Sequence, residues 1–573
     1  MSIRLRLGAP SFQAVAFTTL AALALTSCDK PAQKTQAAPF SVVEASIPDM
    51  QAAMKDGRVT SKEIVTQYLA RIGMYEDKLH AAVAINPNAL AEAEALDKER
   101  AAGHVRGPLH GIPVALKDNI MDKGDMPTSG GMLAFKTYMA PYDSTLAANL
   151  KKAGAIIIAK STMSELAGWF GGDPIPTPGG YNGAAGQSYN PYDPRANDNG
   201  TPVLDTSGSS SGIGVAANLW AANVGTSTGG SIEGPSNANM LVGIRPSTGR
   251  ISRYGIVPLT LDQDTAGPMA KNVTDAAIML GALEGDADPN DARTTTCQPP
   301  ANHDYTQFLK ADALKGARIG IPRGGIYTAV AIPGKDRPGR SLREDEAESM
   351  EAAIAAFKAA GAEVVDPANL PSAVATETAK NLSLHGICQK ASESKGPEEM
   401  CSNVLRYGMK RDFNIWLASL DDKAPVKTLT EFLKWNLDHK DYGAIRYGQA
   451  RLEVADSMDL EKDKARYEAD RANDLKLTRD EGLDAAFNEN KLDVILFPGS
   501  NGANYATKAG YPIMTLPFGM TANPNPGAKG SPDKTRPFGV SIVAKLCEEP
   551  RMLAIGYAFE QATKKRMPPK ATP

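Results

Sequence analysis

The sequence has little of what marks a membrane transporter or a nucleic-acid-binding protein. Only one apolar run of any length is present, near the N-terminus, so the chain is not a polytopic membrane protein. Its 62 lysines and arginines nearly balance its 65 aspartates and glutamates, which leaves no basic footprint for nucleic acid. We therefore expect a small neutral or mixed-charge ligand. Hydrophobic residues make up 42% of the chain, enough for a sizeable core, so the chain as a whole is not disordered.

Cysteine is also scarce, with five residues in the whole chain. No C-x-x-C pair and no zinc-ligand spacing occurs, so the cysteines predict no metal site. One cysteine, Cys28, lies near the N-terminus, and the body contains Cys297, Cys388, Cys401 and Cys547. In an oxidising compartment Cys388 and Cys401 could form a disulfide; the alternative is that they are buried free thiols.

The N-terminus has the features of an export signal. Arg4 and Arg6 precede an apolar stretch over residues 14–25, which is too short to span a bilayer comfortably but typical of a signal peptide. The stretch ends in LTSC, which resembles a bacterial lipobox and implies cleavage before Cys28 and lipid attachment to it. Asp29 resembles the signal that retains lipoproteins at the inner membrane of Gram-negative bacteria. We therefore expect an exported, periplasmic protein anchored to the inner membrane; the alternative is a freely periplasmic or secreted protein.

Helical and strand patterns alternate along the body of the chain. Thr60 and Glu63 form a capping box before apolar residues at helical spacing. Residues 111–119 (GIPVALKDN) are typical of a short buried strand that ends in polar residues. This alternation predicts an α/β sandwich with a large, mixed or parallel sheet covered by helices. The other expected elements are helices over 88–102, 144–153 and 344–360, strands over 155–159, 318–321, 362–365 and 493–497, and a charged helical section over 420–490.

Three short motifs imitate known binding or catalytic sites. Gly154–Ser161 has the outline of a P-loop, but its middle is a strand pattern that cannot curl round a phosphate. Residues 212–217 imitate a dinucleotide-binding fingerprint, but serines precede them where a strand should be. Residues 208–212 match G-x-S-x-G, which would make Ser210 the nucleophile of an α/β-hydrolase-like esterase. The later histidines that such an enzyme needs lie in no recognisable context; they are His303, His385 and His439.

A longer set of motifs is more specific, because its members occur in a fixed order. The set consists of Lys117 in GIPVALKDN, GQSYNP over 186–191, SGSSSG over 207–212, TSTGGSI over 226–232 and QDTAGP over 263–268. Together these motifs resemble the amidase signature family, and the resemblance covers about residues 50 to 565. The wording of GQSYNP and QDT is most similar to the peptide-amidase branch of that family.

The resemblance implies a hydrolase that cleaves a carboxamide through a seryl acyl-enzyme and needs no cofactor. Ser231 matches the nucleophile of the family, and Lys117 matches the base. Ser209 matches the serine that bridges them, which the family holds on a cis peptide bond. The matches to the oxyanion hole are the backbone N–H groups of Thr228, Gly229, Gly230 and Ser231.

The physical chemistry of these residue types suits the reaction. A serine hydroxyl is a poor nucleophile until a neighbour accepts its proton. A lysine accepts it only when neutral, which requires desolvation or nearby positive charge, because its reference pKa is about 10.4. Lys117 follows an apolar strand, which predicts desolvation. Gly229 and Gly230 would let the backbone approach a substrate carbonyl closely and stabilise the oxyanion.

The chain also departs from the family pattern. The spacing between Ser209 and Ser231 is shorter than in that pattern, so Ser207 is the alternative bridging serine. Ser227 replaces the usual acidic residue, and Glu233 stands where an arginine is common. These changes could alter substrate choice, or they could mark an enzyme that has lost activity.

We therefore expect an amidase for a small substrate such as a peptide amide or an aryl amide. The alternatives are an esterase that uses Ser210, a catalytically inactive ligand-binding lipoprotein, and the tRNA-dependent amidotransferase subunit found elsewhere in the family. The export signal argues against the last of these. The expected organisation is a signal peptide over 1–27, a flexible tether over 28–45 and one catalytic domain over 46–570, in which a helix-rich section over about 300–490 shapes the pocket.

Overall fold

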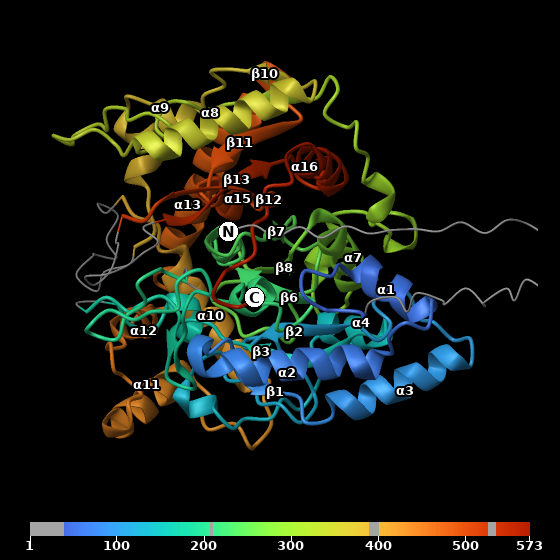
Figure 1. Cartoon of the computed structure of the whole chain (residues 1–573). Coiled ribbons are helices and arrows are strands. Elements are labelled where there is room, and N and C mark those ends of the chain that lie inside the picture. The colour runs from blue at the N-terminus through green and yellow to red at the C-terminus, as the bar shows by residue number, and fades with distance from the viewer. Residues whose placement is uncertain (1–38, 173–174, 207–209, 389–399, 525–534) are drawn as a thin grey trace, which may run out of the picture. The chain divides into compact units, whose positions relative to one another are not determined.

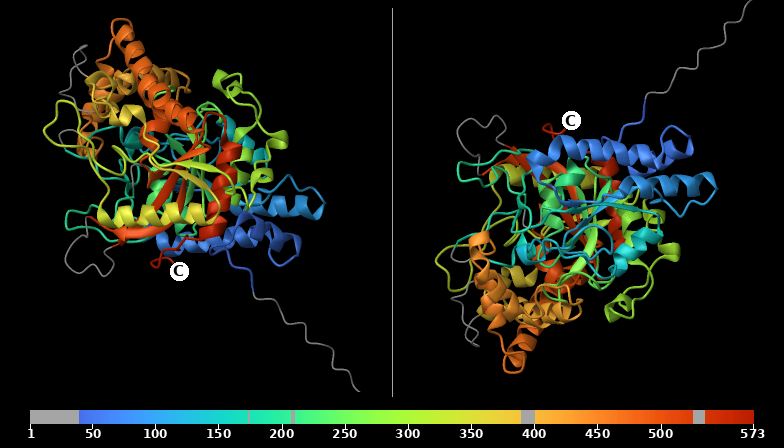
Figure 2. Two further views of the ribbon diagram at one scale, coloured as in Figure 1. Left: turned by 90° about the horizontal axis from the view of Figure 1, so that it is seen from above. Right: turned by 90° about the horizontal axis from the view of Figure 1, so that it is seen from below.

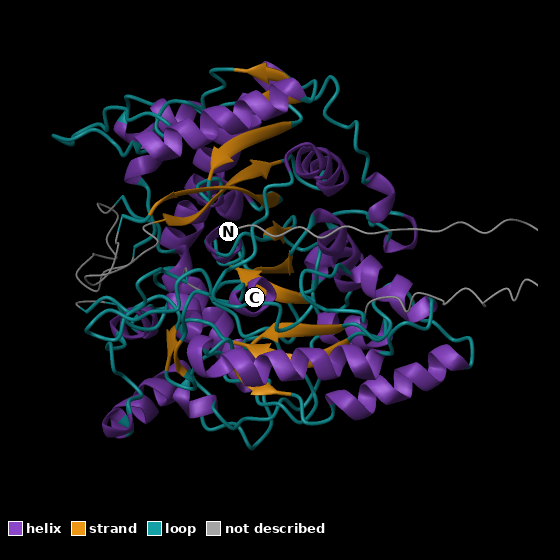
Figure 3. Cartoon of the chain, in the orientation of Figure 1, coloured by secondary structure: helices purple, strands orange, loops and turns teal. Residues whose placement is uncertain are grey.

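A mixed sheet of eleven strands forms the centre of the fold (Figures 1 and 3). Its order is β1-β3-β2-β6-β8-β7-β12-β13-β11-β9-β10. The pairs β3-β2-β6 and β11-β9-β10 are parallel, whereas the central pairs from β6 to β11 are antiparallel. The predicted α/β fold with a large mixed sheet is thus confirmed. This computed structural model describes residues 39–172, 175–206, 210–388, 400–524 and 535–573.

Most strands are short, β12 and β13 are the longest of those described, and β4 and β5 form a separate hairpin. Their bounds are β1 Ala82–Ile85, β2 Pro113–Lys117, β3 Ile156–Ser161, β4 Tyr181–Asn182, β5 Gly186–Gln187, β6 Ala222–Ser227, β7 Val242–Arg245, β8 Thr265–Ala270, β9 Arg318–Gly320, β10 Glu363–Val365, β11 Val494–Pro498, β12 Ile513–Ala522 and β13 Thr535–Val543.

Helices cover the sheet. Four of them, α4, α7, α16 and α8, contact one another in this order and pack against strands of the sheet (Figure 1). Figure 2 shows the sheet and its helices from above and from below. A second group, α10 to α12, surrounds an apolar cluster of its own. The bounds are α1 Ile47–Lys55, α2 Ser61–Leu79, α3 Ala89–Ala101, α4 Thr145–Lys152, α5 Ile213–Ala216, α6 Glu233–Ala238, α7 Val273–Glu284, α8 Glu344–Ala359, α9 Pro371–Val374, α10 Val404–Ala418, α11 Leu429–Asp438, α12 Ala450–Asp456, α13 Lys464–Leu475, α14 Asp484–Asn490, α15 Ala503–Ala509 and α16 Glu549–Thr563.

The predicted elements are present, and most of their ends shift by one or two residues. The capping box forms: the Thr60 side chain accepts the N–H of Glu63, whose carboxylate accepts the N–H of Thr60 in return. Asn88 precedes α3 as expected, but its side chain makes no capping hydrogen bond. The segment that imitates a P-loop is strand β3, fully buried, so it cannot wrap a phosphate. The section over 420–490 is helical, and a π-helical stretch joins α13 to α14.

The structure contains two disulfides between described cysteines, one between residues far apart in the sequence and one between residues close together. Cys388 and Cys401 are bonded, with Cα atoms 4.9 Å apart, which decides between the two alternatives that the sequence left open. The second bond, Cys297–Cys547, spans 250 residues and was not predicted. No helix in the described part of the chain is long and apolar enough to cross a bilayer. The expected signal peptide and Cys28 lie outside the described residues.

Candidate active site

Two neighbouring parallel strands bring the first site residues together. Strand β2 pairs in parallel with β6, with Leu116 opposite Val224, so both strands end at the same edge of the sheet. Lys117 is the last residue of β2 and is completely buried. Its Nζ donates a hydrogen bond to the carbonyl oxygen of Thr226, near the end of β6, over 3.0 Å. The lysine therefore lies beside the segment that leads directly into the glycine-rich TSTGGSI motif.

Burial decides the charge of Lys117. Loss of solvent lowers the pKa of Lys117 to about 7, and the negative charges of Asp264 and Glu233 only partly oppose this. A lysine with this pKa is about half neutral near pH 7 and largely neutral above it, and the neutral form is the one that accepts a proton. The prediction that the apolar strand would desolvate Lys117 is therefore correct, and it supplies the physical property that a base needs.

The four residues that follow β6, Thr228–Ser231, form the loop expected to be the oxyanion hole; we call them the 228–231 loop. Gly229 is exposed, whereas Ser231 is half-buried and precedes α6. Gly230 has φ of 120°, a conformation that other residues rarely adopt. A Cβ at Gly230 would lie 3.4 Å from the Cβ of Ala503 at the start of α15. Glycine is thus required at 230 by its backbone, and this helix lies directly against the loop.

Asp264 holds the first residue of the 228–231 loop. In the sheet Ser227 pairs with Thr265 of β8, which places Asp264 beside Thr228. The Thr228 hydroxyl donates to Oδ1 of Asp264, and Oδ2 accepts the N–H of Leu259 over 2.8 Å. Burial raises the pKa of Asp264 to about 7, against the lowering effect of these hydrogen bonds. In the sequence Asp264 stands only as part of the QDTAGP motif, and it is the strand register that places it beside Thr228 and lets it fix the loop.

The two family departures, Ser227 and Glu233, contact each other. The buried Ser227 Oγ donates to Oε2 of the buried Glu233 over 2.8 Å. The same Ser227 oxygen accepts the N–H of Gly230 over 3.1 Å, and Glu233 also accepts the N–H of Ile232 over 3.2 Å. A hydroxyl–carboxylate pair therefore anchors the backbone on both sides of Ser231. In this structure the Gly230 N–H already donates to Ser227.

The structure describes only some of the serines in the SGSSSG motif, which precedes β6 in the sequence. Residues 207–209, which include the proposed bridging Ser209 and its alternative Ser207, lie outside the described part of the chain. Ser210 is buried, and its Oγ lies 2.9 Å from the hydroxyl of Thr206. The later histidines contact other groups instead: His303 contacts Glu284, His385 contacts Met400 and Asn473, and His439 stacks on Trp435. No serine–histidine pair within the described ranges supports the esterase alternative at Ser210.

A second buried lysine lies on the strand next to β2. Lys160 of β3 is fully buried, and its Nζ donates to the hydroxyl of Thr128 over 2.7 Å. Asp118 accepts the N–H groups of Ser129 and Gly131 over 3.2 and 3.0 Å. Burial lowers the pKa of Lys160 and raises that of Asp118, and each charge opposes the shift of the other. Sequence reasoning gave neither residue a role, although a charged residue directly after a buried strand was an available signal.

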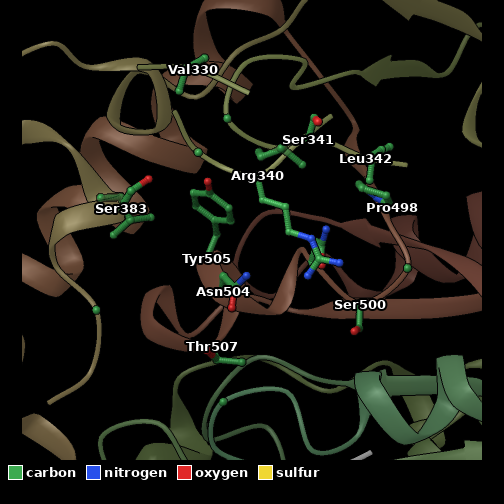
Figure 4. A pocket seen from close by; sticks show the side chains of 18 of the residues that line it. Val330, Arg340, Ser341, Leu342, Ser383, Pro498, Ser500, Asn504, Tyr505 and Thr507 are labelled. Atoms are coloured by element: carbon green, nitrogen blue, oxygen red, sulfur yellow. The ribbon is translucent and has the colours of Figure 1, made fainter. Parts of the chain in front are cut away.

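A cavity of about 750 Å³ opens beside the 228–231 loop, and Gly229 is part of its wall. Its size is within the range of about 300–1,000 Å³ that small-molecule sites occupy. Figure 4 shows its polar side chains, among them Arg340, Ser500 and Asn504. The wall comes mainly from three segments, over residues 325–346, 382–387 and 498–508.

Comparison with known proteins places this chain in one family of enzymes. A family model described as Amidase matches residues 63–553. The native peptide amidase from Stenotrophomonas maltophilia has a similar structure, with a TM-score of 0.77 and 32% identity over 93% of this chain and 100% of that one. A structure of a peptide amidase in complex with the competitive inhibitor chymostatin has a TM-score of 0.76 and 32% identity, and covers 92% of this chain and 100% of that one.

The comparison of sequences indicates the same family as the comparison of structures. A probable amidase from Arabidopsis thaliana is 31% identical over 534 residues, which is 93% of this chain and 92% of that protein. The chain belongs to the amidase signature family and is an amidase-family enzyme, a carbon–nitrogen hydrolase. The predicted family is thereby confirmed.

Proposed function

We propose that the protein hydrolyses a small carboxamide through an acyl-enzyme on Ser231, with Lys117 as the base. The observation that carries this proposal is the buried Lys117, whose pKa is lowered to about 7 and whose Nζ bonds to the strand that leads into the 228–231 loop. A neutral lysine beside a serine-bearing loop supplies the proton acceptor that a serine nucleophile needs.

The proposed reaction proceeds in two halves. Ser231 Oγ bonds to the carbonyl carbon, and its proton passes through Ser209 to Lys117 Nζ. Backbone N–H groups of the 228–231 loop hold the negative oxygen of the tetrahedral intermediate, for which the Gly230 N–H must turn from Ser227 Oγ toward the substrate. The carbon–nitrogen bond then breaks, and the proton on Lys117 moves to the departing nitrogen, which leaves as ammonia or an amine. A water molecule next attacks the acyl carbon and gives a proton to the neutral Lys117. The bond between this carbon and Ser231 Oγ then breaks, the proton returns from Lys117 through Ser209 to Ser231 Oγ, and the acid is released.

Two classes of amide are candidate substrates. The solved peptide amidases cover nearly all of this chain at 32% identity, which supports peptide amides as candidates. Aryl amides are the second candidate class, because the same triad can attack them. A panel of peptide amides and aryl amides, scored by ammonia or amine release, separates the two classes.

We also propose that the protein is exported and anchored to the inner membrane through lipidated Cys28. Two disulfides, Cys388–Cys401 and Cys297–Cys547, support an oxidising compartment such as the periplasm. Metabolic labelling with a fatty-acid probe tests the anchor. Label that persists in Cys28→Ser would contradict it.

Active-site labelling tests the reaction itself. Purified protein without residues 1–28 is treated with a fluorophosphonate probe, which bonds to activated serines. We expect labelling in wild type and in Ser210→Ala, and none in Ser231→Ala. Loss of label only in Ser210→Ala would instead support the esterase alternative, and absence of label in every form would support a ligand-binding protein without activity.

A further inference from the structure

The cavity beside the 228–231 loop contains one cation that no described residue neutralises. Arg340 is exposed and lines this cavity, and its side chain points into it in the direction of Ser500 (Figure 4). Among the described residues it makes no hydrogen bond or ion pair. An arginine guanidinium stays charged and presents a planar set of donors that matches a carboxylate.

The other charged residues of the cavity wall have partners. Arg536 donates to Glu346 over 2.7 Å, and Glu346 is the one carboxylate in this wall as far as the described residues show. Lys508 donates to Asp474 over 2.5 Å and to the carbonyl of His385 over 2.9 Å. After these pairs are formed, the positive charge of Arg340 remains.

Neutral polar groups lie near this charge. Ser500, Asn501 and Asn504 also line the cavity, and their side chains make no hydrogen bond within the described part of the chain. They belong to the segment that leads into and begins α15, whose Ala503 lies against Gly230. The same short segment thus connects the unneutralised arginine side of the cavity with the proposed oxyanion loop.

We propose that the enzyme prefers amides that carry a free carboxylate in addition to the scissile amide group, and that Arg340 binds this carboxylate. A neutral amide would leave the guanidinium to water alone, whereas a carboxylate would gain charge-assisted hydrogen bonds in a partly enclosed site. This inference rests on the proposed amidase function, because it places the substrate in the cavity that Gly229 borders.

Two pairs of matched substrates test the inference. Glutaryl 4-nitroanilide against pentanoyl 4-nitroanilide places the carboxylate on the acyl side of the scissile bond. 4-(Pentanoylamino)benzoate against pentanoyl anilide places it on the amine side. We expect wild type to show a higher kcat/KM for the charged member of one pair, and the pair in which this occurs identifies the side that faces Arg340. Equal kcat/KM within both pairs would overturn the inference.

Variants on one loop provide the control. In Arg340→Gln we expect the charged-to-neutral ratio of kcat/KM to fall about tenfold, as for loss of a hydrogen bond to a charged group. Arg340→Lys should retain part of the ratio, because it keeps the charge without the planar donors. Arg337→Gln is the matched control: Arg337 is exposed on the same loop but does not line the cavity. An equal fall in Arg337→Gln would assign the effect to general charge and contradict a specific role of Arg340.

A binding measurement keeps this result separate from the reaction mechanism. In a Ser231→Ala background, calorimetry compares the Kd of the charged and neutral anilides without turnover. Within the pair that wild type discriminates, or within either pair if wild type hydrolyses none, we expect the charged anilide to bind with the lower Kd. The difference in Kd between the charged and the neutral anilide should disappear when Arg340→Gln is added. If wild type hydrolyses neither anilide and takes no fluorophosphonate label, the proposed function fails, while the binding comparison still decides the role of Arg340. Equal binding of both anilides refutes that role.

Discussion

Lys117 is a lysine whose charge is set by its position in the sheet. The strand before it is buried at every position, and the nearest carboxylates compensate only partly for the lost water. One of these carboxylates, Asp264, is itself buried with a pKa raised to about 7, so it provides a weaker counter-charge near neutral pH. The lysine can therefore give up its proton in the pH range where an amidase would use it.

The pH dependence of acylation follows from this pKa. Neutral Lys117 is the active form, and its pKa is about 7, so the rate of fluorophosphonate labelling should rise with pH and reach half its plateau near pH 7. Stopped labelling reactions between about pH 5 and 9 measure this directly. A rate that is flat over this range, or that falls with rising pH, would show that Lys117 is not the base.

Replacement of Lys117 separates catalysis from folding. The folded pKa lies below the ordinary value of 10.5, so between these two pH values the unfolded chain binds the extra proton and the stability of the fold increases with pH. Lys117→Met removes this cost while filling a similar volume. We expect Lys117→Met to lose labelling at pH 7 but to unfold at a Tm no lower than wild type. A large fall in Tm would show instead that the hydrogen bond to Thr226 is needed for stability.

At the scale of elements, the β6–loop–α6 unit depends on one glycine more than on the other. Gly230 has φ of 120°, which strains any residue with a Cβ, whereas Gly229 has an ordinary φ and open space where a Cβ would lie. The sequence shows two adjacent glycines and does not distinguish them. Only the path of the chain into α6 makes the second one indispensable.

Alanine at each of the two positions tests this difference. Gly230→Ala should lower the free energy of unfolding by about 1–3 kcal/mol, because it forces a residue with a Cβ into a strained conformation. Gly229→Ala has room for its Cβ and serves as the matched control, so its free energy of unfolding should remain close to that of wild type. Urea denaturation followed by circular dichroism measures both. Equal losses in the two variants would contradict the assignment of the strain to Gly230.

At the scale of the whole molecule, residues 40–573 form one compact unit in which distant segments share a sheet. Strand β2 carries the proposed base and β6 leads into the 228–231 loop, while β12 and β13 come from near the end of the chain. The Cys297–Cys547 disulfide ties the middle of the chain to the segment before α16 across 250 residues, whereas Cys388–Cys401 closes a separation of only 13.

The two disulfides should therefore differ in their contribution to stability. A cross-link restricts the unfolded chain more when it closes a longer loop, and the two loop lengths predict a difference of roughly 2–3 kcal/mol. We expect Cys297→Ser/Cys547→Ser to lower the free energy of unfolding more than Cys388→Ser/Cys401→Ser does. Urea unfolding of the two double variants provides the comparison. The reverse order would show that local packing outweighs chain entropy at these sites.

Much of the site could be predicted because short-range patterns encode it. The apolar run before Lys117 predicted a buried lysine, and the capping residues Thr60 and Glu63 predicted the start of α2. The hydrogen bonds of Asp264 to Thr228 and of Glu233 to Ser227 could not be predicted in the same way. The first depends on the antiparallel register of β6 with β8, and the second on how the backbone turns into α6.

The family, the α/β class and the positions that match the nucleophile and base were predictable from the sequence, because ordered motifs and apolar periodicity are local properties of the chain. The pairing of the cysteines, the lowered pKa of Lys117 and the charge of Arg340 in the cavity wall, unpaired among the described residues, arise only in the folded chain. These properties depend on which groups from distant parts of the sequence become neighbours and on how much contact with water each group keeps. Strand pairing determines the neighbours and burial determines the contact with water, and no single segment of the sequence encodes strand pairing or burial.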